Sequence, residues 1–95
     1  MHGHTFWVLG MGNTDEGPYQ GQALETITPI ERDTASVNPN SWLYIRVRMT
    51  NPGAWAFHSH IEWHLSNGLY IIFVSAPEMV RARLGTLPTL PSCPL

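Results

Sequence analysis

Cysteine is nearly absent from this 95-residue sequence, and charged residues are scarce. The one cysteine, Cys93, has no second cysteine to pair with, so no internal disulfide can stabilise the fold. Charged residues make up 13% of the chain and hydrophobic residues 43%, which is too apolar for a disordered chain and too lightly charged for a well-solvated surface. We therefore expect further protein to cover part of this surface.

Long apolar runs and runs of one charge are also lacking. No segment approaches the roughly 18–20 apolar residues of a membrane span. Five basic residues against seven acidic ones give a net charge of −2 with no basic patch, so we expect neither a nucleic-acid nor a membrane partner. Residues Met1 to His4 lack the basic start and apolar stretch of a signal peptide, so we expect no signal peptide in this chain.

Short runs of β-forming residues, separated by turn residues, dominate what is present. Trp42–Thr50 alternates with a period of two, which predicts a half-buried strand. Ala54–His60 follows a turn at 51–53, and we expect these two strands to form a hairpin. Leu69–Ser75 is apolar without alternation, as in a strand buried on both faces. With little predicted helix, the pattern indicates an all-β sandwich or barrel.

Histidines carry the clearest functional signal, because all five fall into two clusters: His2 and His4, then His58, His60 and His64. On a strand, His58 and His60 would share one face about 6.6–6.8 Å apart, and Ser59 would point to the other face. Neutral imidazole is the commonest metal ligand. A lone His-x-His pair is a weak signal, but the second cluster and His64 favour a metal site. We expect His4 to form hydrogen bonds rather than bind metal.

Two longer motifs resemble those of multicopper oxidases of the laccase and ascorbate oxidase type. Residues 2–10 (HGHTFWVLG) resemble the end of that family's third copper motif, His-Pro-x-His-Leu-His-Gly-His, followed by an aromatic strand. Residues 51–65 (NPGAWAFHSHIEWHL) resemble the fourth motif, Asn-Pro-Gly-x-Trp-x-x-His-Cys-His-Ile-x-x-His. An Arg-Asp-Thr at 32–34 lies between them as in the family, and Cys93-Pro94 is similar to a late Cys-Pro. The similarity spans about residues 2–75.

The resemblance implies copper as the cofactor and a role for each histidine. His2, His58 and His60 would be ligands in the trinuclear cluster where dioxygen is reduced. His64 would bind the blue type 1 copper, where electrons arrive from the substrate. The first type 1 histidine of the family motif would lie upstream of Met1, and the trinuclear cluster also needs histidines from another domain.

Two further positions bear on the type 1 site. Ser59 stands where the family has the type 1 cysteine ligand. Serine is a hard oxygen donor with a high pKa, so it cannot replace a thiolate in a blue-copper site. Leu69 falls at the axial position, where an apolar residue leaves copper without a weak further ligand. The resemblance therefore implies a vacated type 1 site and an interrupted electron path.

The resemblance also implies that residues 1–95 form a partial cupredoxin domain, the C-terminal plastocyanin-like domain of a longer oxidase. Its fold would be a Greek-key β-sandwich incomplete at the N-terminal side, with five or six strands and at most two short helices. The remaining cupredoxin domains, or a second copy of this chain, would cover the exposed edges. The parent would be secreted and would oxidise phenolic small molecules while reducing dioxygen to water. We expect this chain alone to be inactive in that turnover, and we assign it no catalytic residue.

Two other functions stay open at this point. One is a small non-redox module that holds copper or zinc with the surviving histidines. The other is a hydrolase with Ser59 as nucleophile. The hydrolase is the least supported, because adjacent strand residues face opposite ways and no Gly-rich elbow or placed carboxylate completes a triad.

Overall fold

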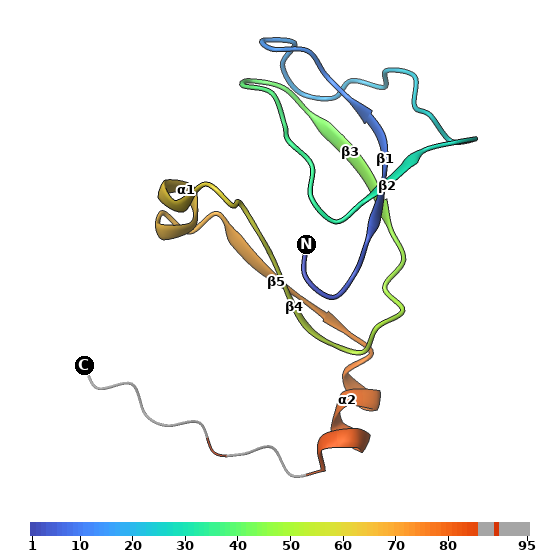
Figure 1. The fold of residues 1–95 in the computed structure, drawn as a ribbon, viewed down its shortest axis with the longest axis vertical. Coiled ribbons are helices and arrows are strands. Elements are labelled where there is room, and N and C mark those ends of the chain that lie inside the picture. Colours follow the sequence, from blue (N-terminus) through green and yellow to red (C-terminus); the bar gives the residue numbers. More distant parts are fainter. Residues whose placement is uncertain (86–88, 90–95) are drawn as a thin grey trace.

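The computed structural model describes residues 1–85 and 89, and this part of the chain holds five strands and two short helices (Figure 1). The elements are β1 (Phe6–Met11), β2 (Ile30–Arg32), β3 (Leu43–Val47), β4 (Gly53–His58), α1 (Glu62–Ser66), β5 (Tyr70–Ser75) and α2 (Pro77–Leu84). The all-β class and the predicted numbers of strands and helices are confirmed for these residues. No described helix is both long and apolar enough to cross a membrane.

The strands form two antiparallel sheets. One has the order β2-β1-β3, and the other consists of β4 and β5 joined through α1. An irregularity between Val8 and Gly10 shifts the register of β1 against β3. The residues before β1 turn away from the three-stranded sheet and run beside β4, where the His2 N–H donates to the Ala56 carbonyl at 2.8 Å (Figure 1). The two histidine-bearing segments are therefore neighbours in space.

The alternation predicted for the strand at 42–50 is confirmed in β3. Leu43, Ile45 and Val47 are half-buried, whereas Tyr44 and Arg46 are exposed. This strand is shorter than predicted. It pairs only with β1, whose first and last residues, Phe6 and Met11, lie opposite Val47 and Leu43.

The predicted hairpin between β3 and β4 is wrong, since β3 pairs with β1 and β4 pairs with β5. Asn51 explains the difference. Its backbone N–H donates to His4 Nε2, its carbonyl accepts from the Trp55 indole, and its side-chain amide donates to the Gly3 carbonyl. The partners of these Asn51 groups are residues 3, 4 and 55, and none of them lies in β3. The chain at Asn51 therefore runs beside residues 3 and 4 and does not close a hairpin with β3.

The core is small. Among the described residues only Phe6, Leu9 and Trp42 are buried hydrophobic side chains. The prediction that residues 69–75 are buried on both faces is also wrong for this chain. Ile72 and Val74 in β5 are 55% and 62% exposed, because no other described element packs on that side of the two-stranded sheet. Exposed apolar surface of this kind is typical of interaction sites.

Glu16 organises the loop after β1. Its carboxylate accepts the Asn13 backbone N–H at 2.7 Å, the Trp42 indole N–H at 3.1 Å and the Gln22 side-chain amide at 3.0 Å. Hydrogen bonds to the charged form, from the Asn13 backbone first and then from Trp42, lower the pKa of Glu16 below its ordinary value. This carboxylate therefore links the loop to one of the few buried aromatic side chains.

Candidate metal centre

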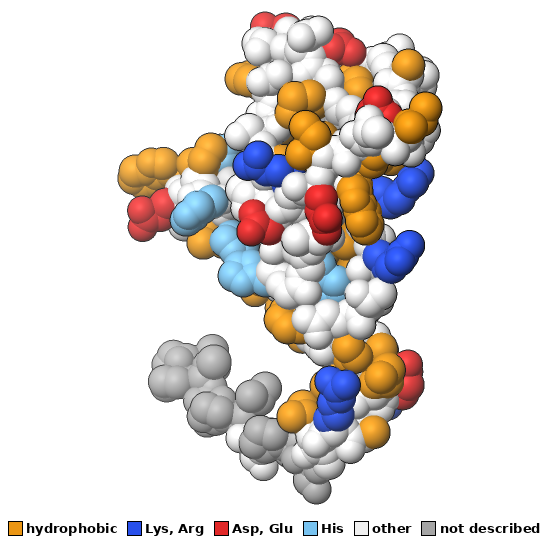
Figure 2. Space-filling model, turned by 45° about the vertical axis from the view of Figure 1, so that its right-hand side comes forward, with side chains coloured by type: hydrophobic (Ala, Val, Ile, Leu, Met, Phe, Trp, Pro, Cys, Tyr) orange, Lys and Arg blue, Asp and Glu red, His pale blue; other side chains and the backbone are white. Residues whose placement is uncertain are grey.

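Two histidines that are distant in sequence meet at the end of β4. His2 Nε2 and His58 Nε2 are 3.0 Å apart, and the ring centroids are 5.1 Å apart. The backbone bond from His2 to Ala56 places the first residue, and the last residue of β4 places the second. Figure 2 shows most of the visible histidine surface in one area beside exposed apolar side chains.

The hydrogen bonding of His58 suits a metal ligand. Its Nδ1 lies 2.8 Å from the Ser59 carbonyl oxygen, which can only accept, so Nδ1 carries the proton. Nε2 of the neutral ring is then an acceptor that faces His2. Donation of the second ring N–H to a backbone carbonyl is the usual support of a metal-bound histidine. The Tyr70 ring from β5 stacks on the His58 ring, with centroids 5.8 Å apart and an angle of 24° between the ring planes.

The spacing of the two Nε2 atoms also fits a shared metal ion. Imidazole nitrogens lie about 2.0–2.1 Å from a tetrahedral metal ion such as zinc, so two of them on one ion would be about 3.3–3.4 Å apart, close to the 3.0 Å between these Nε2 atoms. Without metal, the same distance is an ordinary hydrogen bond in which His2 Nε2–H donates to His58. A cation shared by the pair would therefore replace the shared proton and would require the two rings to separate slightly and turn toward it.

Ser59 and His64 form a second contact, between the end of β4 and α1. Ser59 Oγ lies 3.1 Å from His64 Nδ1 and accepts the Ile61 N–H at 3.2 Å. The Ser59 N–H donates to the Leu69 carbonyl, and the Leu69 N–H donates to the His64 carbonyl. The backbone of Leu69 thus joins the two residues, while its side chain is 58% exposed.

His60 stands apart from both contacts. The strand β4 ends at His58, so the predicted alternation does not extend through His60, which is exposed in a bend. Within residues 1–85 and 89, no three histidine, cysteine, aspartate or glutamate side chains are grouped closely enough to hold a metal ion. The described chain therefore contains a histidine pair rather than a complete three-ligand site, and a role for His60 stays a prediction.

The contact between Ser59 and His64 lacks the features of a hydrolase. No carboxylate in the described residues bonds to His64, and Ser59 Oγ meets Nδ1, the nitrogen that a triad uses for its acid. Glu62 lies next to this contact in α1 but makes no hydrogen bond with it in the described part of the chain. The geometry therefore disfavours nucleophilic catalysis by Ser59.

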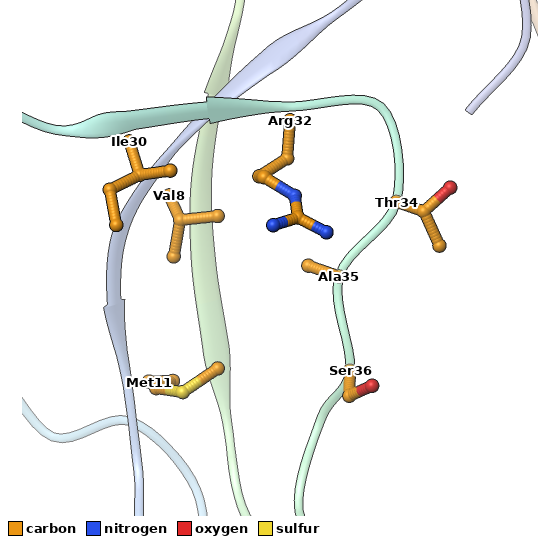
Figure 3. A pocket seen from close by; sticks show the side chains of 7 residues that line it. All are labelled: Val8, Met11, Ile30, Arg32, Thr34, Ala35 and Ser36. Carbon is orange, nitrogen blue, oxygen red and sulfur yellow. The ribbon is translucent and has the colours of Figure 1, made fainter.

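A separate shallow hollow of about 280 Å³ lies between β1, β2 and residues 34–36 (Figure 3). Its walls are mostly apolar, with the Arg32 guanidinium directed across it. No histidine lines it, so it is distinct from the histidine pair.

Two structural partners of the histidines were missed from the sequence. Tyr70 stacks on His58, but its position in an unbroken apolar run carries no signal for this role. Asn51 bonds to the segment of residues 3 and 4, and its place before Pro-Gly predicts a turn but not a distant contact.

Comparison with known proteins identifies the family of this chain. A family model described as multicopper oxidase matches residues 1–79. The chain is 46% identical over 82 residues to the iron transport multicopper oxidase fio1 of Schizosaccharomyces pombe, covering 84% of this chain and 13% of that protein. It is 40% identical over 89 residues to L-ascorbate oxidase of Cucurbita pepo var. melopepo, covering 94% and 15%. It is also 40% identical over 95 residues to a laccase of Cryphonectria parasitica, covering 90% and 16%.

The chain thus spans about one seventh of the length of these relatives. No solved structure matches it significantly. The antiparallel strands and few helices agree with the cupredoxin-like fold of such oxidase domains. Copper is the cofactor of these proteins, and on the family match and these identities the chain belongs to the multicopper oxidase family.

Proposed function

We propose that this chain is the C-terminal part of the third cupredoxin domain of a laccase-like oxidase. The parent protein would oxidise phenolic small molecules and reduce dioxygen to water, and it would be secreted. The observation that carries the proposal is the 3.0 Å approach of His2 and His58, one from each copper-motif resemblance. The residues that the family pattern pairs at copper are thus neighbours in the folded chain.

In this proposal each histidine keeps the role that the resemblance implies. His2, His58 and His60 would hold copper in the trinuclear cluster, and bound copper would supply the electron transfer to dioxygen. His58 is held in the ligand tautomer by the Ser59 carbonyl, and His2 is oriented by its bond to Ala56. This chain's own contribution is therefore to fix two imidazoles at ligand spacing.

The type 1 site would be vacated at Ser59. The contact between Ser59 Oγ and His64 Nδ1 supports this, because two ligands of one metal ion must face each other at such a distance. Leu69, at the axial position, is bonded through its backbone to both residues. A hydroxyl in place of a thiolate leaves no soft anionic ligand there.

The exposed apolar surface of β5 supports the proposed partners, which are the other cupredoxin domains of the parent. A chain with a seventh of its relatives' length and so few buried side chains has most of its natural contacts outside itself. For the chain alone we therefore infer no oxidase turnover. Copper-dependent phenol oxidation with stoichiometric oxygen uptake, absent in a His58→Ala, His60→Ala control, would contradict this inference.

A second candidate function, a non-redox copper or zinc module, is favoured by the same histidine pair, since two neutral imidazoles suit either ion. Titration with copper(II) and zinc(II) by calorimetry tests both functions. Removing one of two ligands in His58→Ala should weaken binding at least about tenfold. Equal binding by His58→Ala would show that the site is elsewhere. The redox response of bound copper to a phenol then separates the two functions.

A further inference from the structure

We propose that His4 is a positioning residue: with Asn51 and Trp55 it latches residues 1–4 onto the start of β4 and so sets the spacing of His2 and His58. The inference rests on the proposed copper-binding role of that histidine pair. It concerns a histidine to which the proposed function gives no ligand role.

The latch consists of two hydrogen bonds between segments 47 or more residues apart in sequence and a third within the second segment. The Asn51 backbone N–H donates to His4 Nε2 at 3.3 Å, and the Asn51 side-chain amide donates to the Gly3 carbonyl at 3.0 Å. The Trp55 indole N–H donates to the Asn51 carbonyl at 2.8 Å. Asn51 therefore bonds to residues 3, 4 and 55 at once.

Close packing accompanies these bonds. The His4 ring meets the Trp55 ring edge-on, with centroids 5.9 Å apart and planes at 87°. Gly3 has a φ of 69°, and a Cβ atom at this position would collide with the Trp55 indole. Only glycine permits both the backbone conformation and this approach. The indole is thus held between His4 and the backbone of residue 3.

The hydrogen bonds also explain why His4 acts as a latch and not as a ligand. A backbone N–H can only donate, so His4 Nε2 accepts, and its lone pair is occupied. His4 Nδ1 is buried and has no hydrogen-bond partner among the described residues. Because Nε2 accepts, Nδ1 carries the ring proton. Neither nitrogen therefore has a lone pair free for a metal ion beside His2.

The latch acts on the copper ligands through short stretches of chain. Gly3 alone separates His4 from His2, and two residues separate Trp55 from His58. Within the described residues, these segments are also joined by the bond from the His2 N–H to the Ala56 carbonyl and by the contact between the two imidazoles themselves. The Met1 amino group donates to the Asp33 carbonyl, outside the second segment. The backbone that carries the His2 imidazole is thus bonded on both sides of residue 3, and loss of the His4 acceptor removes one of the bonds on the His4 side. Preorganised ligands bind a metal more tightly.

Two variants of His4 test the latch, and they differ in whether the side chain can accept a hydrogen bond. His4→Leu keeps a branched side chain of similar reach but removes the acceptor. His4→Gln places a carbonyl oxygen where Nε2 was and restores the acceptor. Circular dichroism and urea unfolding identify conditions in which each variant is folded, so that a general loss of stability is separated from a local change.

The first measurement uses the metal-free chain: the nuclear Overhauser contact between ring protons of His2 and His58. We expect the contact in the unsubstituted chain and in His4→Gln, and its loss in His4→Leu. The second measurement is copper(II) affinity, which should fall at least about tenfold in His4→Leu and recover in His4→Gln. A folded His4→Leu that keeps both the ring contact and the affinity overturns the proposal, and so does a His4→Gln as impaired as His4→Leu.

Trp55→Phe provides an independent variant should both His4 variants unfold. It keeps an aromatic ring but removes the indole N–H that bonds to Asn51, and we expect a weaker ring contact between His2 and His58. An unchanged contact in folded Trp55→Phe counts against the latch. Failure of the latch and failure of the proposed function can be told apart. Absence of copper binding in the unsubstituted chain overturns the proposed function, whereas the ring contact in the metal-free chain tests the latch alone.

Discussion

Ser59 Oγ faces His64 Nδ1 at 3.1 Å across the bend that separates β4 from α1. Both residues are also tied to the backbone of Leu69, so the contact does not depend on the side chains alone. A ligand atom at position 59 would meet the imidazole of residue 64 without rearrangement of the chain. Substitution of residue 59 therefore tests the proposed type 1 site directly.

Ser59→Cys should not produce a blue copper centre in this chain. Such a centre needs one cysteine and two histidines in a near-trigonal plane, and among the described residues His64 is the only histidine that contacts the side chain of residue 59. The His58 ring is held away by its bond to the Ser59 carbonyl. The thiol should instead bind copper weakly or be oxidised by it. The measurement is the visible spectrum with copper(II).

Ser59→Ala is the matched control for that experiment. An intense blue band from Ser59→Cys alone would show that the ligands are misassigned. Adding an upstream segment with the family's His-Pro-x-His should supply the second imidazole. Absence of a blue band from that folded, extended variant would argue against the assignment of position 59.

Gly3→Ala should destabilise the chain more than Gly21→Ala. Both glycines have a positive φ, but a Cβ at residue 3 collides with Trp55, whereas a Cβ at residue 21 has no atom within 4 Å. The shared backbone cost cancels, and the collision should add about 1–3 kcal/mol. Urea unfolding followed by tryptophan fluorescence measures the difference. Equal losses in the two variants would mean that Trp55 does not lie over residue 3 in solution.

Self-association should occur through β5. Its Ile72 and Val74 side chains are more than half exposed, and its outer edge is unpaired within the described residues. Sedimentation at high concentration should show dimers or larger species. Val74→Lys should shift them toward monomer, because a charge on the strand disfavours edge pairing. Ile27→Lys, at a loop position that is 90% exposed, should leave the distribution unchanged. A monomeric unsubstituted chain would contradict the prediction.

Glu16 should make stability depend on pH in the acidic range. The pKa of Glu16 is lowered in the folded chain, first by the Asn13 backbone N–H and then by the Trp42 indole. The stability that the Glu16 carboxylate contributes is therefore present at pH values above its ordinary pKa of 4.5. It is lost as pH falls through the lower pKa that Glu16 has in the folded chain. Glu16→Gln should reduce stability at neutral pH and flatten this dependence. Glu62→Gln, whose carboxylate has no hydrogen bond in the described residues, should do neither.

The strands and the family could be predicted from the sequence because both signals are local. Alternation in β3 reports the face of a strand, and residues 51–65 carry a motif long enough to identify copper chemistry. The all-β class followed from such runs and their turns. Pairing could not be predicted in the same way, because each β strand offers similar backbone partners to several others.

The sequence by itself determined which residues carry imidazole groups and that position 59 carries a hydroxyl instead of a thiol. Only the tertiary structure decided which of them meet. His2 meets His58 next to the segment where Asn51 bonds to residues 3 and 4, and His60 stands apart because β4 ends before it. The reason is physical: ligand identity is a property of a side chain, whereas ligand geometry depends on hydrogen bonds between segments about fifty residues apart, which local sequence does not encode.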